Sequence, residues 1–162
     1  MNLAWLLPVL LLSSVVPNAD KPAQPHSMVV PSQDAEMSAA MAKARASLDE
    51  FLAIAANPPP GTDQFKLKIM LRDGNTIEHV WVTPFRATAE GFEGILANEP
   101  RAVWTVRAGQ NLRFTREQIS DWGYVRDGVQ VGSFTVCVLL ERLPSEQAAQ
   151  LRQTHGFACP AS

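Results

Sequence analysis

The residues of this chain that could take part in chemistry lie in its middle, where one histidine stands among acidic and hydroxyl side chains. A hydrolase needs a nucleophile, or a water molecule, that is activated by a base. The candidates are His79, Glu78, Glu93, Glu99, Ser120 and Asp121. Their spacing matches no catalytic signature such as Gly-x-Ser-x-Gly or His-Glu-x-x-His. We therefore predict no catalytic residue, with His79 and a nearby carboxylate, Glu78 or Asp121, as the alternative.

The same residues also allow a metal site or a purely structural role. Imidazole and carboxylate groups suit several divalent ions, which would make His79 a ligand together with Glu93, Glu99 or Asp121. Nothing in the sequence sets a ligand spacing, so we expect no metal and no other cofactor. Asp121 has a simpler interpretation, in which its carboxylate accepts backbone amides in a turn and directs Trp122 into the core.

Aromatic side chains are more numerous than the core of a small sheet requires, and this favours a recognition surface. Large aromatic residues and Arg are favoured at the centres of protein interfaces, although contacts between cations and rings are also ordinary surface features. Trp104 is expected opposite Arg113 on neighbouring strands. The binding residues that we predict are Trp81, Lys66, Phe92, Glu93, Asn98 and Trp122.

A hairpin is expected to position His79 and Trp81. The strand over residues 65–71 alternates apolar and polar side chains, and Asp73-Gly74 separates it from a second run that ends at Thr83. Asp-Gly favours a two-residue turn because both positions need positive φ. A turn there places Lys66 opposite Trp81 and Lys68 opposite His79, while Leu67 and Val80 share the other face. The Lys68 charge would then keep His79 neutral.

The remaining pattern predicts an α+β fold, with an antiparallel sheet of five or six strands between helices at the two ends. A helix over residues 34–56 is capped by Ser32 or Asp34 and stopped by Asn57 and the prolines after it. Residues 84–101 are predicted to form a long loop with a defined shape. Further expected elements are a hairpin around residues 108–109 that pairs 102–106 with 111–115, a helical turn over 115–122, a hairpin at 127–128, a central strand over 134–140 and a helix over 144–154 that Gly156 stops.

The start of the chain favours export. Residues 1–19 carry no Lys, Arg, Asp or Glu, and their apolar run has the length of a secretory signal rather than of a membrane span. An uncleaved anchor is the alternative. Residues 20–33, rich in proline, are expected to form a flexible linker before a single domain over 34–159. Cys137 and Cys159 fit an oxidising compartment, where we favour a disulfide over two free thiols.

Charge limits the class of partner. The chain has 14 Lys and Arg against 16 Asp and Glu, a net charge of -2, so it lacks the general attraction to phosphate backbones that nucleic-acid binding needs. We expect no nucleic acid and no membrane contact beyond the leader. Another envelope protein, in the periplasm or outside the cell, is the partner that we consider, whereas the sequence sets no oligomeric state.

Three short motifs carry a family resemblance. They are Glu78-His79-Val80-Trp81, the segment Gly91-Phe92-Glu93-Gly94 with Asn98-Glu99-Pro100 after it, and Ile119-Ser120-Asp121-Trp122, which runs into Gly132-Ser133-Phe134-Thr135-Val136. Over residues 65–152 the chain resembles the uncharacterised bacterial family named domain of unknown function 2314. The resemblance implies this fold and a bacterial origin, and it supplies no activity. The function that we predict is an exported, non-enzymatic binding module, with a small hydrolase or metal-assisted enzyme that uses His79 as the alternative.

Overall fold

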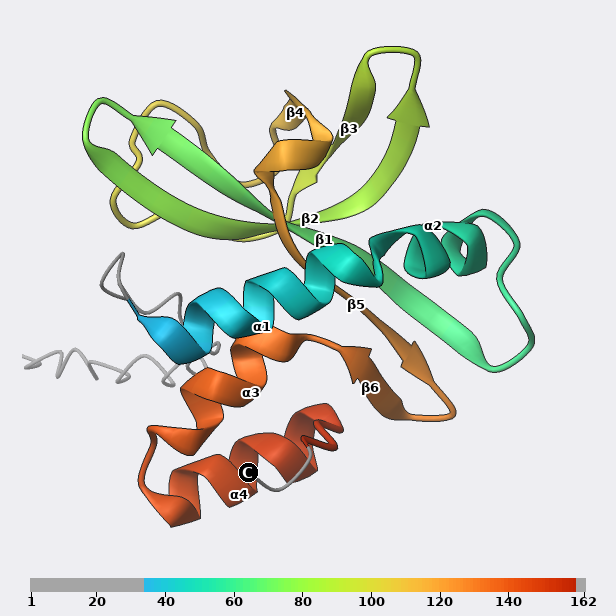
Figure 1. The fold of residues 1–162 in the computed structure, drawn as a ribbon, viewed down its shortest axis with the longest axis vertical. Helices are drawn as coiled ribbons and strands as arrows, with labels where there is room; N and C mark the ends of the chain where they lie inside the picture. Colours follow the sequence, from blue (N-terminus) through green and yellow to red (C-terminus); the bar gives the residue numbers. More distant parts are fainter. Residues whose placement is uncertain (1–33, 160–162) are drawn as a thin grey trace, which may run out of the picture.

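A six-stranded sheet in the order β4-β3-β2-β1-β5-β6 forms the centre of the molecule, and neighbouring strands are antiparallel. This confirms the predicted α+β class. The computed structural model describes residues 34–159, so the predicted leader over 1–19 and linker over 20–33 lie outside the described residues. The elements, shown in Figure 1, are α1 (Ala35–Ala46), α2 (Leu48–Ala56), β1 (Thr62–Asp73), β2 (Thr76–Thr88), β3 (Gly91–Leu96), β4 (Asn111–Phe114), η1 (Arg116–Gln118), β5 (Ile119–Arg126), β6 (Val129–Gly132), α3 (Phe134–Glu141) and α4 (Ser145–His155).

The hairpin of β1 and β2 exists, but its register differs by two residues from the prediction. Asp73 pairs with Thr76, so Gly74 and Asn75 form the turn in place of Asp73 and Gly74. Lys68 therefore lies opposite Trp81, and Met70 rather than Lys68 lies opposite His79. Because side chains alternate with a period of two, a shift of two residues leaves each side chain on its predicted face.

The prediction of one long loop over residues 84–101 is wrong. Strand β2 continues to Thr88, and β3 follows a tight turn and pairs back onto it from Gly91 to Leu96. The glycines of this segment allow the pairing, because a Cβ on Gly94 would lie 2.5 Å from Val82 Cγ1 and 2.7 Å from the Pro84 oxygen. A motif that reads as a loop is thus a strand that approaches its neighbour closely.

The expected hairpin around residues 108–109 is also wrong in its pairing. A turn is present at Ala108 and Gly109, but residues 102–106 form no strand. Strand β4 pairs with β3 instead, with Glu93 opposite Arg113, and the long loop of the domain covers residues 97–110. Trp104 consequently has no cross-strand partner. The turn signal was correct, whereas the choice of the strand that pairs with β4 was not.

Two further assignments exchange helix and strand. The predicted central strand over residues 134–140 is α3, and the predicted helical turn that carries Ile119 and Trp122 belongs to β5, after the short η1. A short apolar run does not distinguish a buried strand from a buried helix by its periodicity. The hairpin at Asp127-Gly128 joins β5 to β6, and α4 ends at Gly156, both as predicted.

The predicted N-terminal helix is interrupted. It starts where expected, since Asp34 caps it by accepting the Met37 amide at 3.0 Å, and it ends at Asn57. Ser47 divides it into α1 and α2, and its hydroxyl donates to the Lys43 oxygen at 2.9 Å. Such a back-bond from a Ser side chain bends helices. The bend lets α1 follow β5 while α2 covers a different part of the sheet (Figure 1).

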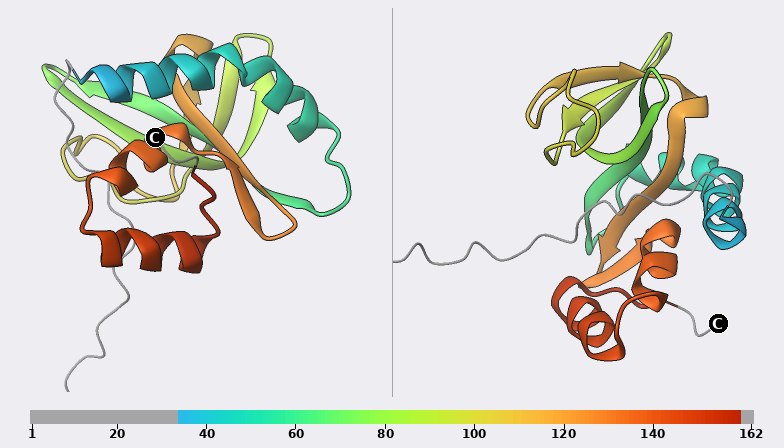
Figure 2. Two further views of the ribbon diagram at one scale, coloured as in Figure 1. Left: turned by 60° about the horizontal axis from the view of Figure 1, so that its bottom comes forward. Right: turned by 90° about the vertical axis from the view of Figure 1, so that its left-hand side faces the viewer.

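The core joins α2 to the sheet through aromatic rings. Phe51 is fully buried, with ring centroids 4.9 Å from Trp122, 5.9 Å from Phe85 and 6.1 Å from Phe65. Trp122 also donates its indole N–H to the Ala44 oxygen at 2.9 Å, which fixes α1 against β5. Helices α3 and α4 lie together at the end of the molecule away from β3 and β4 (Figure 2, right). The N-terminal end of α3 contacts β5, and this contact builds the site described next.

Candidate functional site

His79 meets a serine, not a carboxylate. Its Nδ1 atom lies 2.8 Å from Ser120 Oγ, and this hydroxyl also donates to the Lys68 carbonyl oxygen at 3.3 Å. Burial, and then the charges of Lys68 and Arg45, lower the pKa of His79 to about 4, so the imidazole is neutral near pH 7. Ser120 has 0% of its surface exposed, so the pair offers no nucleophile to a substrate in solution.

Glu78 points to the opposite face of β2 from His79, because neighbouring residues of a strand alternate. Its carboxylate accepts the amides of three consecutive residues, Arg101 at 2.8 Å, Ala102 at 2.8 Å and Val103 at 3.1 Å. The Glu78 side chain is buried. The residue that the sequence offers as a catalytic alternative therefore holds the loop over residues 97–110.

Asp121 anchors the start of α3. Its Oδ1 atom accepts the amides of Trp122 at 2.8 Å and Phe134 at 3.2 Å, and its Oδ2 atom accepts the Thr135 amide at 2.8 Å and the Thr135 hydroxyl at 2.5 Å. Burial raises the pKa of Asp121, and the Lys68 charge and these donors oppose that increase. The carboxylate accepts amides as the structural interpretation proposed, but from a strand rather than a turn.

Two lysines of β1 share the face of the sheet that carries Asp121. The Lys68 ammonium group is buried and donates to the Thr135 hydroxyl at 2.8 Å, which links it to the Asp121 carboxylate. Lys66 is half-buried, and burial lowers the pKa of both lysines. Their Nζ atoms lie over the ring of Trp81, 5.0 Å from its centroid for Lys66 and 4.7 Å for Lys68. The predicted contact of Lys66 with Trp81 is present, although Lys68 is the cross-strand neighbour.

The loop over residues 97–110 is held at several points besides Glu78. The Asn98 side chain accepts the Trp81 amide at 3.0 Å, and the Ala97 amide donates to the Trp81 oxygen at 2.8 Å. Glu99 accepts the Ala108 amide at 3.0 Å. Val103 is buried with 2% exposure, whereas the next residue, Trp104, is 79% exposed. Sequence reasoning named Trp104 but placed it in a strand, so it missed this exposure.

The other predicted binding residues separate. Phe92 is 8% exposed and stacks on Phe114, with ring centroids 5.7 Å apart, and Trp122 is 6% exposed in the core. Glu93 pairs with Arg86 at 2.6 Å and approaches Arg113 at 3.8 Å. Phe92 and Trp122 therefore belong to the core, whereas Glu93 is engaged with two arginines. Thr135, which accepts from Lys68, was not predicted as a site residue because it was assigned to a strand, and Ser133, close to Gly123, was not predicted as one either.

A concavity of about 520 Å³ lies elsewhere on the described part of the chain. It is an open hollow between the β2–β3 hairpin and η1, and it contains neither Glu78, His79 nor Asp121. Within residues 34–159 no three His, Cys, Asp or Glu side chains are grouped so that they could hold a metal ion. The residues that line the concavity are Arg86, Thr88, Ala89, Glu90, Phe92, Glu93, Arg113, Phe114, Thr115 and Gln118.

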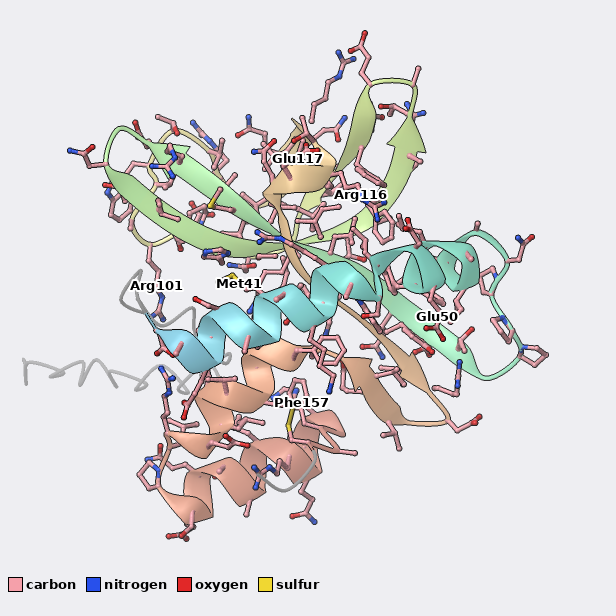
Figure 3. All side chains as sticks on the ribbon, in the orientation of Figure 1. Met41, Glu50, Arg101, Arg116, Glu117 and Phe157 are labelled. Carbon is pink, nitrogen blue, oxygen red and sulfur yellow. A yellow bond between two sulfur atoms is a disulfide. The ribbon has the colours of Figure 1, made fainter. Side chains whose placement is uncertain are left out.

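A disulfide joins Cys137 to Cys159, with Cα atoms 5.5 Å apart. It ties the segment after α4 to α3, close to Phe157 (Figure 3). Cys137 was expected in a strand and lies in a helix, but the pairing of the two cysteines is the predicted one. None of the helices that the structure describes has the length and apolar character of a membrane span.

Comparison with known proteins returns relatives without a described activity. The family model described as "Uncharacterized protein conserved in bacteria", domain of unknown function 2314, matches residues 34–159. The uncharacterized protein YegJ of Escherichia coli K12 is 34% identical over 116 residues, which cover 72% of this chain and 74% of YegJ. A putative ankyrin repeat protein of Neisseria meningitidis serogroup B is 28% identical over 78 residues, 48% of this chain and 31% of that protein. No solved structure matches.

Proposed function

Because this chain belongs to the bacterial family domain of unknown function 2314, whose description names no activity, we propose a function from its own geometry. The domain is an exported, non-enzymatic binding module, and it contacts another envelope protein through the loop over residues 97–110. Trp104 is the centre of this contact. The observation that carries the proposal is that a side chain with 79% exposure stands on a backbone held by a buried carboxylate.

A single exposed apolar side chain is ordinary on a protein surface. The support comes from the loop beneath Trp104, whose backbone is held on both sides of the tryptophan. Glu78 binds the three amides that precede Trp104, and Glu99 binds the Ala108 amide that follows it. Association then orders few additional groups, which removes part of the entropic cost of binding. Trp is also a residue type that dominates the binding energy at interface centres.

Two arginines beside Trp104 indicate which charge the surface of a partner should carry. Arg101 and Arg107 stand three residues before and three residues after Trp104, and both are exposed. Figure 3 shows Arg101 on the side of the molecule where α1 begins. Arg pairs strongly with carboxylates. The surface therefore suits an acidic protein face with an apolar pocket, and electrostatic attraction would raise the rate of association.

Two observations support the proposed export. Residues 1–19 have the composition of a secretory signal. The disulfide between Cys137 and Cys159 is of the kind that persists outside the reducing cytosol. Fractionation of the native host, with alkylation of free thiols before and after reduction, tests both points. Recovery of the chain in the cytoplasm with two alkylated cysteines would overturn the proposed compartment.

The binding role is tested with a photo-crosslinking amino acid at position 107, beside Trp104, in the native host. Crosslinked proteins are identified, and the affinity of the purified partner is then measured for each variant. We expect Trp104→Ala to weaken binding by about 2 kcal/mol or more, a change typical of an interface hot spot. Arg101→Glu with Arg107→Glu should weaken it further and reduce its dependence on salt.

Val129→Ala is the matched control. Val129 is another exposed large apolar residue, at 43%, and lies in β6, away from the loop. Its substitution should leave the affinity unchanged. Equal affinity of the Trp104→Ala variant and the wild type, with both folded, would refute the proposal.

The hydrolase alternative is supported by one distance, the 2.8 Å between His79 Nδ1 and Ser120 Oγ. Against it stands the complete burial of Ser120. A fluorophosphonate probe that labels exposed, activated serines distinguishes the two roles. We expect no label on Ser120, and a label that disappears in His79→Ala would favour the alternative.

A further inference from the structure

The face of the sheet formed by β1 and β5 carries two buried or half-buried ammonium groups and one carboxylate. Asp121 can accept hydrogen bonds at about four lone-pair positions. All four are taken by the amides of Trp122, Phe134 and Thr135 and by the Thr135 hydroxyl. Lys68 reaches this carboxylate through Thr135. The Asp121 carboxylate therefore has no acceptor position left for the Lys66 ammonium group.

Lys66 pairs through its backbone with β5, but its ammonium group makes no hydrogen bond and no salt bridge within residues 34–159. Its ammonium group contacts the ring of Trp81, with 5.0 Å between Nζ and the ring centroid. The Asp121 charge acts on it only from a distance, because no salt bridge joins the two. A half-buried cation without a carboxylate partner is a favourable place for an anion, since burial weakens its hydration and strengthens its attraction to opposite charge.

A second unpaired group lies beside it. The Ser133 hydroxyl is fully buried and has no hydrogen-bond partner within the described part of the chain. Buried polar atoms of this kind are rare in folded proteins and call for an explanation. An ideal Cβ on Gly123 would lie 2.6 Å from Ser133 Oγ and 3.1 Å from Lys66 Cε. Because Gly123 has no Cβ, the Lys66 side chain and the Ser133 hydroxyl can both pack against its backbone.

We propose that Lys66, Ser133 and the ring of Trp81 form a binding site for a carboxylate group. One carboxylate oxygen accepts from the Lys66 ammonium group, and the other accepts from the Ser133 hydroxyl after a small movement of the Lys66 side chain. The Trp81 ring flanks the apolar part of the ligand. One ammonium group and one hydroxyl group supply one positive charge and two hydrogen-bond donor directions. These match the single charge and two oxygens of a carboxylate better than a doubly charged phosphate.

The site is tested on the purified full-length chain by titration with phenylacetate, observed through the indole N–H signal of Trp81 in NMR. Phenylacetamide has the same shape without the charge, and chloride and inorganic phosphate at equal ionic strength report general ion effects. We expect a saturable shift with phenylacetate alone. No saturable shift, or equal shifts with phosphate and chloride, would overturn the proposal.

Substitutions locate the binding. Lys66→Gln should weaken phenylacetate binding about ten-fold or more, corresponding to one lost charge-assisted contact. Lys43→Gln is the matched control, because it removes the same charge from another lysine that contacts an aromatic ring. The Lys43 Nζ atom lies 5.0 Å from the ring centroid of Phe134, the residue after Ser133. The Lys43→Gln variant should bind as the wild type does. Equal binding by the Lys66→Gln variant would refute the assignment.

Ser133 needs two variants, because it adopts the left-handed conformation, with φ of 53°. Ser133→Ala removes the hydroxyl, and Ser133→Gly removes it while relieving the backbone. Both should weaken binding several-fold, and unchanged affinity in a folded variant of either kind would remove Ser133 from the site. The site is independent of the proposed protein contact. Trp104→Ala must therefore bind phenylacetate like the wild type, whatever it does to the partner.

Discussion

Removal of the Glu78 carboxylate, which lies in β2, should destabilise the loop over residues 97–110 more than removal of the Glu99 carboxylate within that loop. Glu78→Ala leaves three amides without their acceptor, those of Arg101, Ala102 and Val103. The first two are partly exposed, and water can replace the carboxylate at a cost of about 0.5–1 kcal/mol each. The Val103 bond is buried, and an unsatisfied amide there costs about 1–3 kcal/mol. The total is about 2–5 kcal/mol, a large share of the roughly 5–15 kcal/mol that holds a typical domain folded.

Urea unfolding followed by tryptophan fluorescence measures this loss. Limited trypsin digestion measures whether it is confined to the loop, because Arg101 and Arg107 are cleavage sites within it. Glu99→Ala is the control, since Glu99 accepts only one exposed amide, at 3.0 Å from Ala108. It should cost less than about 1 kcal/mol. Glu78→Gln keeps the side-chain length and one acceptor, and should fall between the two.

Two different results would refute this reasoning. One is a Glu78→Ala variant that unfolds within about 0.5 kcal/mol of the wild type, the range of ordinary surface substitutions, and resists trypsin equally well. The other is a Glu99→Ala variant that loses as much stability as Glu78→Ala. Either would mean that buried acceptance of the Val103 amide does not set the stability of the loop, and the support for a pre-organised Trp104 would fail with it.

Two further predictions concern His79 and Gly94. The pKa of His79 is about 4 in the folded chain, below its usual 6.5, so the unfolded chain binds more protons between these values. Stability should consequently fall by up to about 3 kcal/mol as pH decreases from about 6.5 to about 4, and it should depend less on pH in His79→Gln. NMR should find a neutral His79 near pH 5, whereas a charged imidazole there would contradict its burial. Gly94→Ala should cost about 1–3 kcal/mol in urea unfolding, because the added Cβ would lie 2.5 Å from Val82 Cγ1; a loss below about 0.5 kcal/mol would show that the strands separate freely.

Local chemistry explains the parts of the fold that could be predicted. Gly128 and Gly156 adopt positive φ, and they mark a hairpin and a helix end where the sequence places them. Asp34 caps α1 and Asn57 ends α2, because capping and proline restriction depend only on neighbouring residues. The disulfide between Cys137 and Cys159 was predicted from compartment and composition rather than from contacts.

The failures concern choices that depend on distant residues. The apolar run from Phe134 to Leu140 suits a buried strand or a buried helix, and contact with α1 and Asp121 decides for the helix. Gly94 reads as a loop residue until Val82 is known to lie against it. The observed β1–β2 register differs by two residues from the predicted one, because Asp-Gly and Gly-Asn are both acceptable turns. None of these choices is encoded within a short segment.

For the site, sequence reasoning identified the polar residues but not their partners. Glu78, His79 and Asp121 were grouped because they are titratable, yet alternation along β2 sends Glu78 and His79 to opposite faces. Asp121 meets Thr135 only because α3 is a helix that begins beside β5. Trp104 was given a strand partner, so its exposure could not be anticipated. A site that is built from contacts between elements far apart in the sequence can be predicted only when the fold is known.

The motifs that carry the family resemblance supply residues that make contacts inside the domain. Glu78 and Asn98 hold the loop, Gly94 allows β3 to approach β2, and Asp121 starts α3. These contacts would be needed whatever the domain binds, so the motifs specify a scaffold. Two of the groups proposed to bind, Trp104 on the loop and Lys66 on the sheet, lie outside the motifs, whereas Trp81, whose ring contacts Lys66, lies within one. Substitutions at Trp104 and Lys66 should therefore preserve the scaffold, because they leave the internal hydrogen bonds of Glu78, Asn98 and Asp121 in place.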